Sequence, residues 1–166
     1  GDRVGGPGAS VVRQLTFRGD IIAGDLAPDG RLEAHVCEAG LLVYLNLDTG
    51  EQDAGPVTLE SSGDTVSFIG NRGGELRWSP SGQEIAIVGT PRPGAATLST
   101  YIIGRGTHEA VTVGPEGFAG VAWSPDGGRI AGVRARLTAR TLSVLERASG
   151  QVRDVPLDGS TAPKQV

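Results

Sequence analysis

Residues 121–133 read VAWSPDGGRIAGV, and this stretch decides the fold because the chain contains it twice. Residues 76–88 read LRWSPSGQEIAIV, and seven of the thirteen aligned positions are identical at an offset of 45 residues. A third and weaker copy begins at Asp25, where DLAPDGR precedes the alternating run LEAHV. Its proline lies 52 residues before Pro80, so an insertion of about seven residues separates the first two copies. The repetition predicts an array of similar structural units.

Each unit is expected to contain four short strands separated by turns. In the last unit we expect strands at 118–123, 129–133, 141–147 and 152–157, with the turn Ser-Pro-Asp-Gly at 124–127. Proline fixes φ in such a turn, and glycine supplies a positive φ that other residues resist. Four-stranded units repeated at this spacing are typical of β-propeller blades. The predicted fold class is therefore all-β, with about three propeller-type blades of four antiparallel strands.

The blade count predicts a partial propeller. We expect one propeller-like domain at 10–157, with blades at about 20–60, 64–114 and 117–157. The run SVVRQLTF at 10–17 is interpreted as the last strand of a preceding blade, residues 1–9 as a flexible lead-in and residues 158–166 as a C-terminal tail. Three blades cannot close a ring, since propellers have at least about four. Either the chain is part of a longer propeller, or another copy completes the ring, or a partner caps the end blades.

Three residues of the repeats are predicted to be buried in the hydrophobic core. Trp78 and Trp123 stand directly before the two strongest turns. We interpret them as wedges between adjacent blades rather than as surfaces for stacking a ligand. The single cysteine, Cys37, ends an alternating strand and is interpreted as a small buried hydrophobic residue rather than a reactive thiol.

The motif resembles that of a known group of proteins. Trp-Ser-Pro-Asp-Gly at 123–127, followed by Ile130 and Ala131 and a later Ser-Gly-Gln turn at 149–151, is similar to the TolB-type, WD40-like repeat of bacterial propellers. The same motif occurs in propeller domains of prolyl-oligopeptidase-type peptidases. The resemblance covers roughly residues 20–157 and implies a bacterial cell-envelope protein, periplasmic or extracellular. It transfers no binding residue, because the matching residues build the blades.

The sequence contains few candidates for a catalytic, metal-binding or phosphate-binding site. His35 and His108 have no second histidine or cysteine at metal-ligand spacing. The serine-hydrolase motif Gly-x-Ser-x-Gly is missing, and the glycine-rich run at 70–74 is not followed by Lys-Ser or Lys-Thr. The sequence therefore predicts no catalytic residue, no metal and no cofactor. A net charge of −4 and the lack of an apolar run near 18 residues argue against binding of nucleic acid and against membrane insertion.

A protein partner is the predicted ligand. In propellers the loops between blades and the loops between strands two and three share one face, and here that face contains the longest insertions. Phe68, Arg72 and Arg92 are the candidate contacts in these loops, because aromatic residues and arginine dominate interface hot spots. For Phe68 the alternative is a place in the core on an extra piece of strand.

An arginine cluster is a second candidate contact. Arg134 and Arg136 are expected in the loop between strands two and three of the last blade. They would meet an anionic partner, or they form part of an ordinary solvated surface in an arginine-rich protein.

These observations favour a non-enzymatic protein-binding module that recognises a protein partner through its loop face or its channel. Two alternatives belong to other classes of function. The chain is an accessory propeller of a hydrolase or peptidase, or it is a structural module whose blades self-assemble into a homo-oligomer that completes the propeller.

Overall fold

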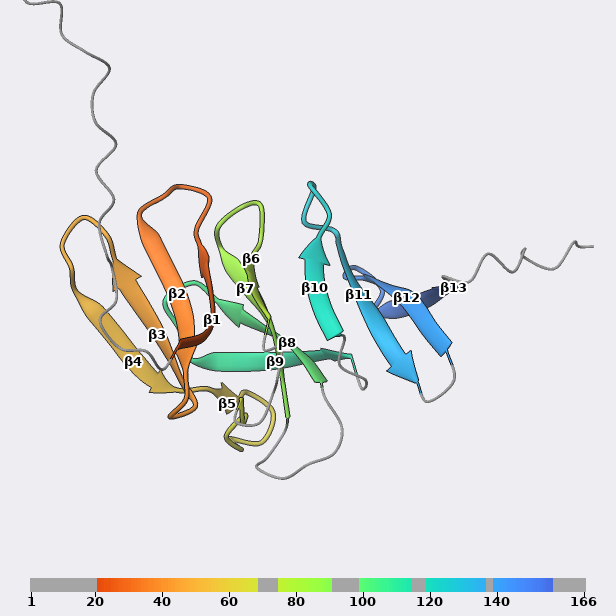
Figure 1. Ribbon diagram of the computed structural model, residues 1–166, viewed down its shortest axis with the longest axis horizontal. Coiled ribbons are helices and arrows are strands. Elements are labelled where there is room, and N and C mark those ends of the chain that lie inside the picture. The colour runs from red at the N-terminus through yellow and green to blue at the C-terminus, as the bar shows by residue number, and fades with distance from the viewer. Residues whose placement is uncertain (1–20, 69–74, 91–98, 115–118, 137–138, 157–166) are drawn as a thin grey trace, which may run out of the picture.

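Three β-sheets build the molecule (Figure 1). The computed structural model describes residues 21–68, 75–90, 99–114, 119–136 and 139–156. Blade 1 is the sheet β1-β2-β3-β4, which consists of β1 (Ile21–Leu26), β2 (Leu32–Cys37), β3 (Leu41–Asn46) and β4 (Gln52–Pro56). Blade 2 is the sheet β5-β9-β8-β7-β6, which consists of β5 (Thr58–Leu59), β6 (Leu76–Trp78), β7 (Glu84–Gly89), β8 (Ser99–Gly104) and β9 (Glu109–Gly114). Blade 3 is the sheet β10-β11-β12-β13, which consists of β10 (Ala119–Trp123), β11 (Arg129–Arg136), β12 (Ala139–Glu146) and β13 (Gln151–Pro156).

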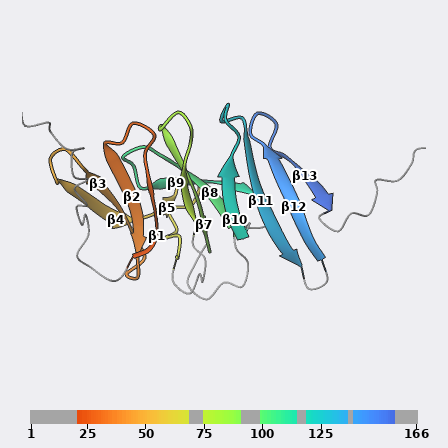
Figure 2. The same cartoon turned by 45° about the horizontal axis from the view of Figure 1, so that its top comes forward.

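The blades stand side by side in chain order, and their first strands β1, β6 and β10 are neighbours. The predicted all-β fold of propeller-type blades is therefore confirmed. Figure 2 shows the turns β1–β2, β6–β7 and β10–β11 along one edge of the array. We call this edge, together with the turns that follow β3, β8 and β12, the turn face.

The Pro-Gly turns have a common backbone. In each, the residue before the proline donates its N–H to the carbonyl of the residue that starts the second strand: Ala27 to Leu32, Ser79 to Glu84 and Ser124 to Arg129. The glycines at 30, 82 and 127 have φ values of 69°, 67° and 70°. Residues with a Cβ rarely adopt this left-handed region, so glycine is required where the chain reverses.

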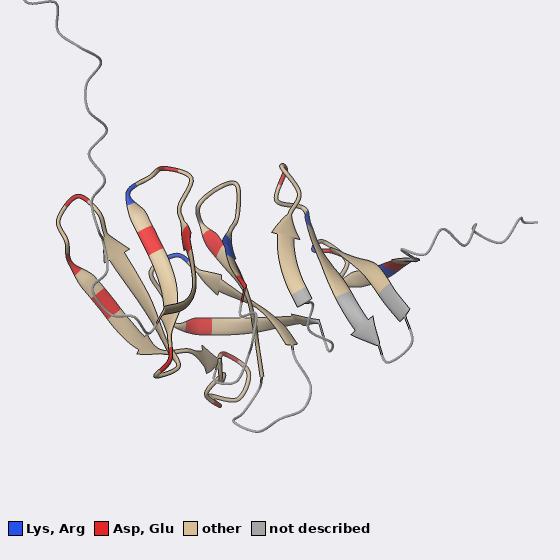
Figure 3. Cartoon of the chain, viewed as in Figure 1, with Lys and Arg blue, Asp and Glu red and all other residues tan. Residues whose placement is uncertain are grey.

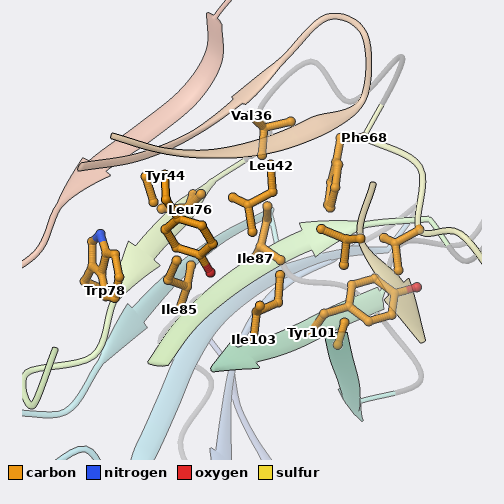
Figure 4. Packing of buried hydrophobic residues seen from close by; sticks show 14 of the residues in the cluster. Val36, Leu42, Tyr44, Phe68, Leu76, Trp78, Ile85, Ile87, Tyr101 and Ile103 are labelled. Atoms are coloured by element: carbon orange, nitrogen blue, oxygen red, sulfur yellow. The ribbon is translucent and has the colours of Figure 1, made fainter. Parts of the chain in front are cut away.

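The core lies between the blades. One cluster fills the space between blades 1 and 2, and Figure 4 shows Leu42 and Tyr44 of blade 1 meeting Leu76, Ile85 and Ile87 of blade 2. A second cluster joins blades 2 and 3 through side chains on the opposite face of blade 2: Ala86, Val88 and Ile102 with Val121, Ile130 and Leu145. Blade 2 is therefore apolar on both faces, which explains the nearly continuous apolar run of β7.

One strand departs from the expected blade boundaries. β5, which the sequence places in the first blade, pairs in parallel with β9 of blade 2 through Thr58↔Glu109 and Leu59↔Ala110. The chain thus crosses to blade 2 directly after β4. The predicted strand at 10–17 lies outside the described residues.

Candidate binding surface

The joint between blades 1 and 2 is built on Trp78. Its side chain is 6% exposed, and its indole Nε1–H donates to the carbonyl of Asp25 in β1 at 3.1 Å. The backbone N–H of Trp78 donates to Asp25 Oδ2 at 2.9 Å. Above the indole, the Arg105 guanidinium lies 5.7 Å from the ring centroid and reaches Asp29 Oδ2 of blade 1 at 2.8 Å. One tryptophan and one arginine of blade 2 therefore hold three acceptor atoms of blade 1, on Asp25 and Asp29.

The joint between blades 2 and 3 repeats this arrangement. Trp123 Nε1–H donates to the carbonyl of Arg77 at 3.0 Å. The Arg147 guanidinium lies 5.2 Å from the Trp123 ring centroid. It forms a bidentate ion pair with the Glu84 carboxylate of blade 2, with N···O distances of 2.6 and 2.7 Å. We call this combination, a tryptophan on a carbonyl and an arginine on a carboxylate of the preceding blade, the interblade latch. The predicted role of both tryptophans as wedges between blades is confirmed.

The arginines of the latch were missed in the sequence. Arg105 and Arg147 each follow the third strand of their blade. Their backbone N–H groups donate to the carbonyls of Gln83 and Gly128, which hold equivalent positions in the turn between the first two strands. Their spacing is 42 residues, whereas the tryptophans are 45 apart, so alignment of the turn motif hides the correspondence. Alignment from the third strand would have revealed it.

A groove opens on the turn face between blades 1 and 2. Its volume is about 550 Å³. It is lined by Leu32, Tyr44, Asn46, Glu51, Gln52, Asp53 and Gly106. We call it the acidic groove, because Glu51 and Asp53 are its only charged residues and both are exposed. Figure 3 shows acidic segments along β2, β4 and β9.

The floor of the acidic groove is held by aromatic contacts. The Tyr44 ring lies 6.2 Å from the ring of Trp78 and 5.6 Å from that of His108 in an edge-to-face arrangement. His108 Nε2 lies 3.2 Å from the carbonyl oxygen of Leu42 in blade 1, and Nδ1 lies 4.0 Å from Asp53 Oδ2. These contacts fix the ring of Tyr44 relative to the exposed carboxylates above it.

The hydroxyl of Tyr44 fixes one wall of the groove. It donates to the carbonyl of Thr107 at 3.0 Å and lies 3.2 Å from that of Gly104, so it holds the turn that carries Gly106. Burial raises the pKa of Tyr44 far above its usual value, and the negative charge of Asp53 raises it further. The hydroxyl therefore stays protonated near neutral pH and acts there as a donor.

Replacing Tyr44 with phenylalanine is expected to lower the free energy of unfolding by about 1 kcal/mol, because the two carbonyls lose their donor. Tyr101→Phe is the matched control. The hydroxyl of Tyr101 is buried and has no hydrogen-bond partner among the described residues, so its removal should be neutral or slightly stabilising. Urea denaturation of the two variants checks the difference, and equal losses would contradict the assigned hydrogen bonds.

A second groove of about 360 Å³ lies between the turns of blades 2 and 3. Its lining includes Ser81 and Asp126 as well as Glu84 and Arg147. Glu84 and Arg147 pair with each other, so these two charges are satisfied within the groove. The acidic groove is larger and carries carboxylates without a cationic partner in its lining, which makes it the better candidate for a ligand.

Of Phe68, Arg72 and Arg92, the loop residues predicted as contacts, only Phe68 lies within the described residues. Phe68 is 2% exposed and belongs to the cluster between blades 1 and 2, so its prediction as a surface contact is wrong and the core alternative is confirmed. Its ring and Val66 close over Gly89, where an added Cβ would lie 3.0 Å from the Phe68 ring and 2.9 Å from Val66 Cγ1. Arg72 and Arg92 lie outside the described residues.

The arginine cluster lies on strands rather than in a loop. β11 continues to Arg136 and β12 begins at Ala139, and the pairs Arg134↔Thr141 and Arg136↔Ala139 belong to one ladder. The expected loop is wrong because the backbone groups of these residues pair with each other and extend the hairpin. The side chains of Arg134 and Arg136 are not described.

Cys37 is 8% exposed, as expected for a small buried residue. Within the described ranges, no group of three His, Cys, Asp or Glu side chains is placed to hold a metal ion. The same ranges contain no helix that is long and apolar enough to cross a membrane.

No protein-family model and no curated protein sequence matches the chain. Among solved structures, it matches a protein described as a TolB from Agrobacterium tumefaciens with a TM-score of 0.62 and 19% sequence identity. The chain has a TolB-like fold. The match covers 86% of this chain and 48% of the TolB chain, so the chain spans about half the length of that TolB-like propeller.

Proposed function

We propose that this chain is a non-enzymatic protein-binding module of the TolB-like propeller type, and that it holds a basic segment of a protein partner in the acidic groove. The observation that carries the proposal is the groove itself. Two exposed carboxylates, Glu51 and Asp53, stand over a floor of Leu32 and Tyr44. The TolB-like fold supports this class of function and a place in the bacterial cell envelope.

The chemistry of the groove suits a lysine or arginine side chain. The stem of such a side chain packs on apolar surface while its charged end stays near water. The half-buried Leu32 offers the apolar surface, since Tyr44 is only 3% exposed, and Glu51 and Asp53 offer acceptors for the charged end. The Gln52 amide and the Asn46 NH₂ group can bond the backbone of an extended peptide, whereas Asn46 Oδ1 already accepts the N–H groups of Asp48 and Thr49. The volume of about 550 Å³ accommodates a few residues.

Selection of peptides from a random displayed library against the purified chain tests the proposal. The selected peptides are expected to be enriched in lysine and arginine. Glu51→Lys should weaken their binding by at least about ten-fold, because it reverses a charge inside the groove. Raising the ionic strength should weaken binding in the same direction.

Glu38→Lys is the matched control. Glu38 is exposed in the turn between β2 and β3, at the opposite edge from the turn face, and the substitution changes the net charge equally. Binding by this variant should stay within about two-fold of the unmodified chain. If no peptide is enriched, or if both lysine variants bind the peptides equally, the acidic groove is not the binding site.

A further inference from the structure

His108 adjoins the acidic groove and contacts two of its lining residues, Tyr44 and Asp53. It lies directly before β9 in blade 2, whereas Tyr44 and Asp53 belong to β3 and β4 of blade 1. The His108 side chain is 21% exposed and that of Asp53 is 68% exposed. A titratable ring of blade 2 therefore lies against one of the two carboxylates that line the groove.

Contacts on three sides fix the orientation of this ring. Its Nε2 lies 3.2 Å from the carbonyl oxygen of Leu42, and its plane meets the Tyr44 ring edge-to-face. On β4, a Cβ added to Gly55 would lie 3.3 Å from two ring carbons, which is closer than an ordinary carbon–carbon contact. The ring therefore has little room to turn, and Nδ1 stays directed at Asp53 Oδ2, 4.0 Å away.

The carbonyl of Leu42 determines which nitrogen carries the hydrogen of the neutral ring. A carbonyl oxygen only accepts hydrogen bonds, so Nε2 is the nitrogen that bears hydrogen and donates it. In the neutral ring, Nδ1 then presents a lone pair to the Asp53 carboxylate, and the two groups do not attract each other. A second proton has to bind to Nδ1, where it converts this contact into an ion pair with Asp53.

Asp53 is the charged side chain that the described structure places against this ring. β3 contributes Tyr44, which stays uncharged because burial raises the pKa of its hydroxyl. β5 contributes the backbone N–H of Thr58, which donates to the carbonyl of His108. The charged residues close to His108 in sequence pair elsewhere or are exposed: Arg105, which pairs with Asp29, and Glu109.

We infer that His108 makes the acidic groove sensitive to pH, so that the groove holds a basic partner near neutral pH and releases it in a weakly acidic medium. Histidine is the side chain whose charge changes between pH 5 and 8. Protonated His108 neutralises Asp53, and Glu51 then remains as the unpaired carboxylate of the lining. A lysine or arginine bound at Asp53 in turn disfavours the second proton on His108. This regulation rests on the proposed function, because it acts on the same groove.

The affinity of the full chain for a selected basic peptide, measured by fluorescence anisotropy at about pH 7.5 and at about pH 5.5, tests this regulation. The peptide contains no histidine and has a blocked N-terminus, and carboxylates, lysine and arginine ordinarily keep their charge over this range. Binding should weaken by roughly three- to five-fold at the lower pH, because protonated His108 then competes with the peptide for an exposed carboxylate. Equal affinities at the two pH values would overturn the regulation and leave the proposed function intact.

His108→Gln is the decisive variant, because glutamine keeps a donor for the carbonyl of Leu42 but does not titrate. Its affinities at the two pH values should agree within about 1.5-fold. His35→Gln is the matched control, since it removes the other histidine of the chain. His35 pairs with Glu33 on the face of blade 1 that points away from blade 2, so this variant should keep the full response. A response that persists in His108→Gln would overturn the regulation.

The free chain offers a test that needs no peptide. The carbon-13 resonance of the Asp53 carboxylate should move together with the ring resonances of His108 as the pH is lowered, and it should stay still over the same range in His108→Gln. A carboxylate resonance that does not follow His108 would overturn the regulation alone. A peptide that is bound at neither pH would instead contradict the proposed function.

Discussion

Replacing Trp78 with alanine is expected to lower the free energy of unfolding by about 3–5 kcal/mol, one of the two largest losses expected for a single residue. The indole is 6% exposed, packs on Tyr44 and carries Arg105 over its face. Its loss leaves a cavity between blades 1 and 2 and removes the donor to the carbonyl of Asp25. Denaturant unfolding followed by circular dichroism measures the effect.

Two further variants show how much of this loss comes from the hydrogen bond, from the buried apolar area and from the position in the joint. Trp78→Phe keeps most of the apolar area and removes the indole N–H, so it should cost clearly less than Trp78→Ala. Trp123→Ala removes the equivalent residue of blade 3, which is only half-buried, and should also cost less. A loss at Trp78 no greater than that at Trp123 would contradict a closed joint between blades 1 and 2.

Replacing Phe68 with alanine is expected to cost a similar amount, about 3–5 kcal/mol. The ring is 2% exposed and lies against Gly89 of β7, with no room for an added methyl group. The loss would therefore come from a cavity in the cluster between blades 1 and 2. Thermal or denaturant unfolding checks it.

Val111→Ala is the control for Phe68→Ala. Val111 is an apolar strand residue of blade 2, but it is 49% exposed, so its truncation should cost well under 1 kcal/mol. Phe68→Ala should also leave the affinity for selected basic peptides unchanged once the protein is folded. A stable Phe68→Ala variant with impaired binding would restore the surface role that the structure contradicts.

The strands and turns could be predicted because their causes are local. Proline and glycine fix the turns at 28–30, 80–82 and 125–127, and the alternation or continuity of apolar residues marks the strands between them. The wedge role of Trp78 and Trp123 followed from the same repeat. These features repeat along the chain, so each copy supports the interpretation of the others.

The acidic groove could not be predicted because its residues meet only through packing. Leu32 begins β2, Glu51 directly precedes β4, and Gly106 lies in the turn after β8 of another blade. The burial of Phe68 and the pairing of β5 with β9 likewise depend on contacts between blades. A pattern within one repeat does not contain this information.

Backbone amide chemical shifts, recorded while a selected basic peptide is titrated into the isotopically labelled chain, test the proposed function most directly. The largest changes are expected at residues 44–46, 51–53 and 106, with no change of similar size along β11 or β12. Glu51→Lys should abolish these changes, and Glu38→Lys should leave them intact. Changes concentrated away from the turn face between blades 1 and 2 would contradict binding in the acidic groove.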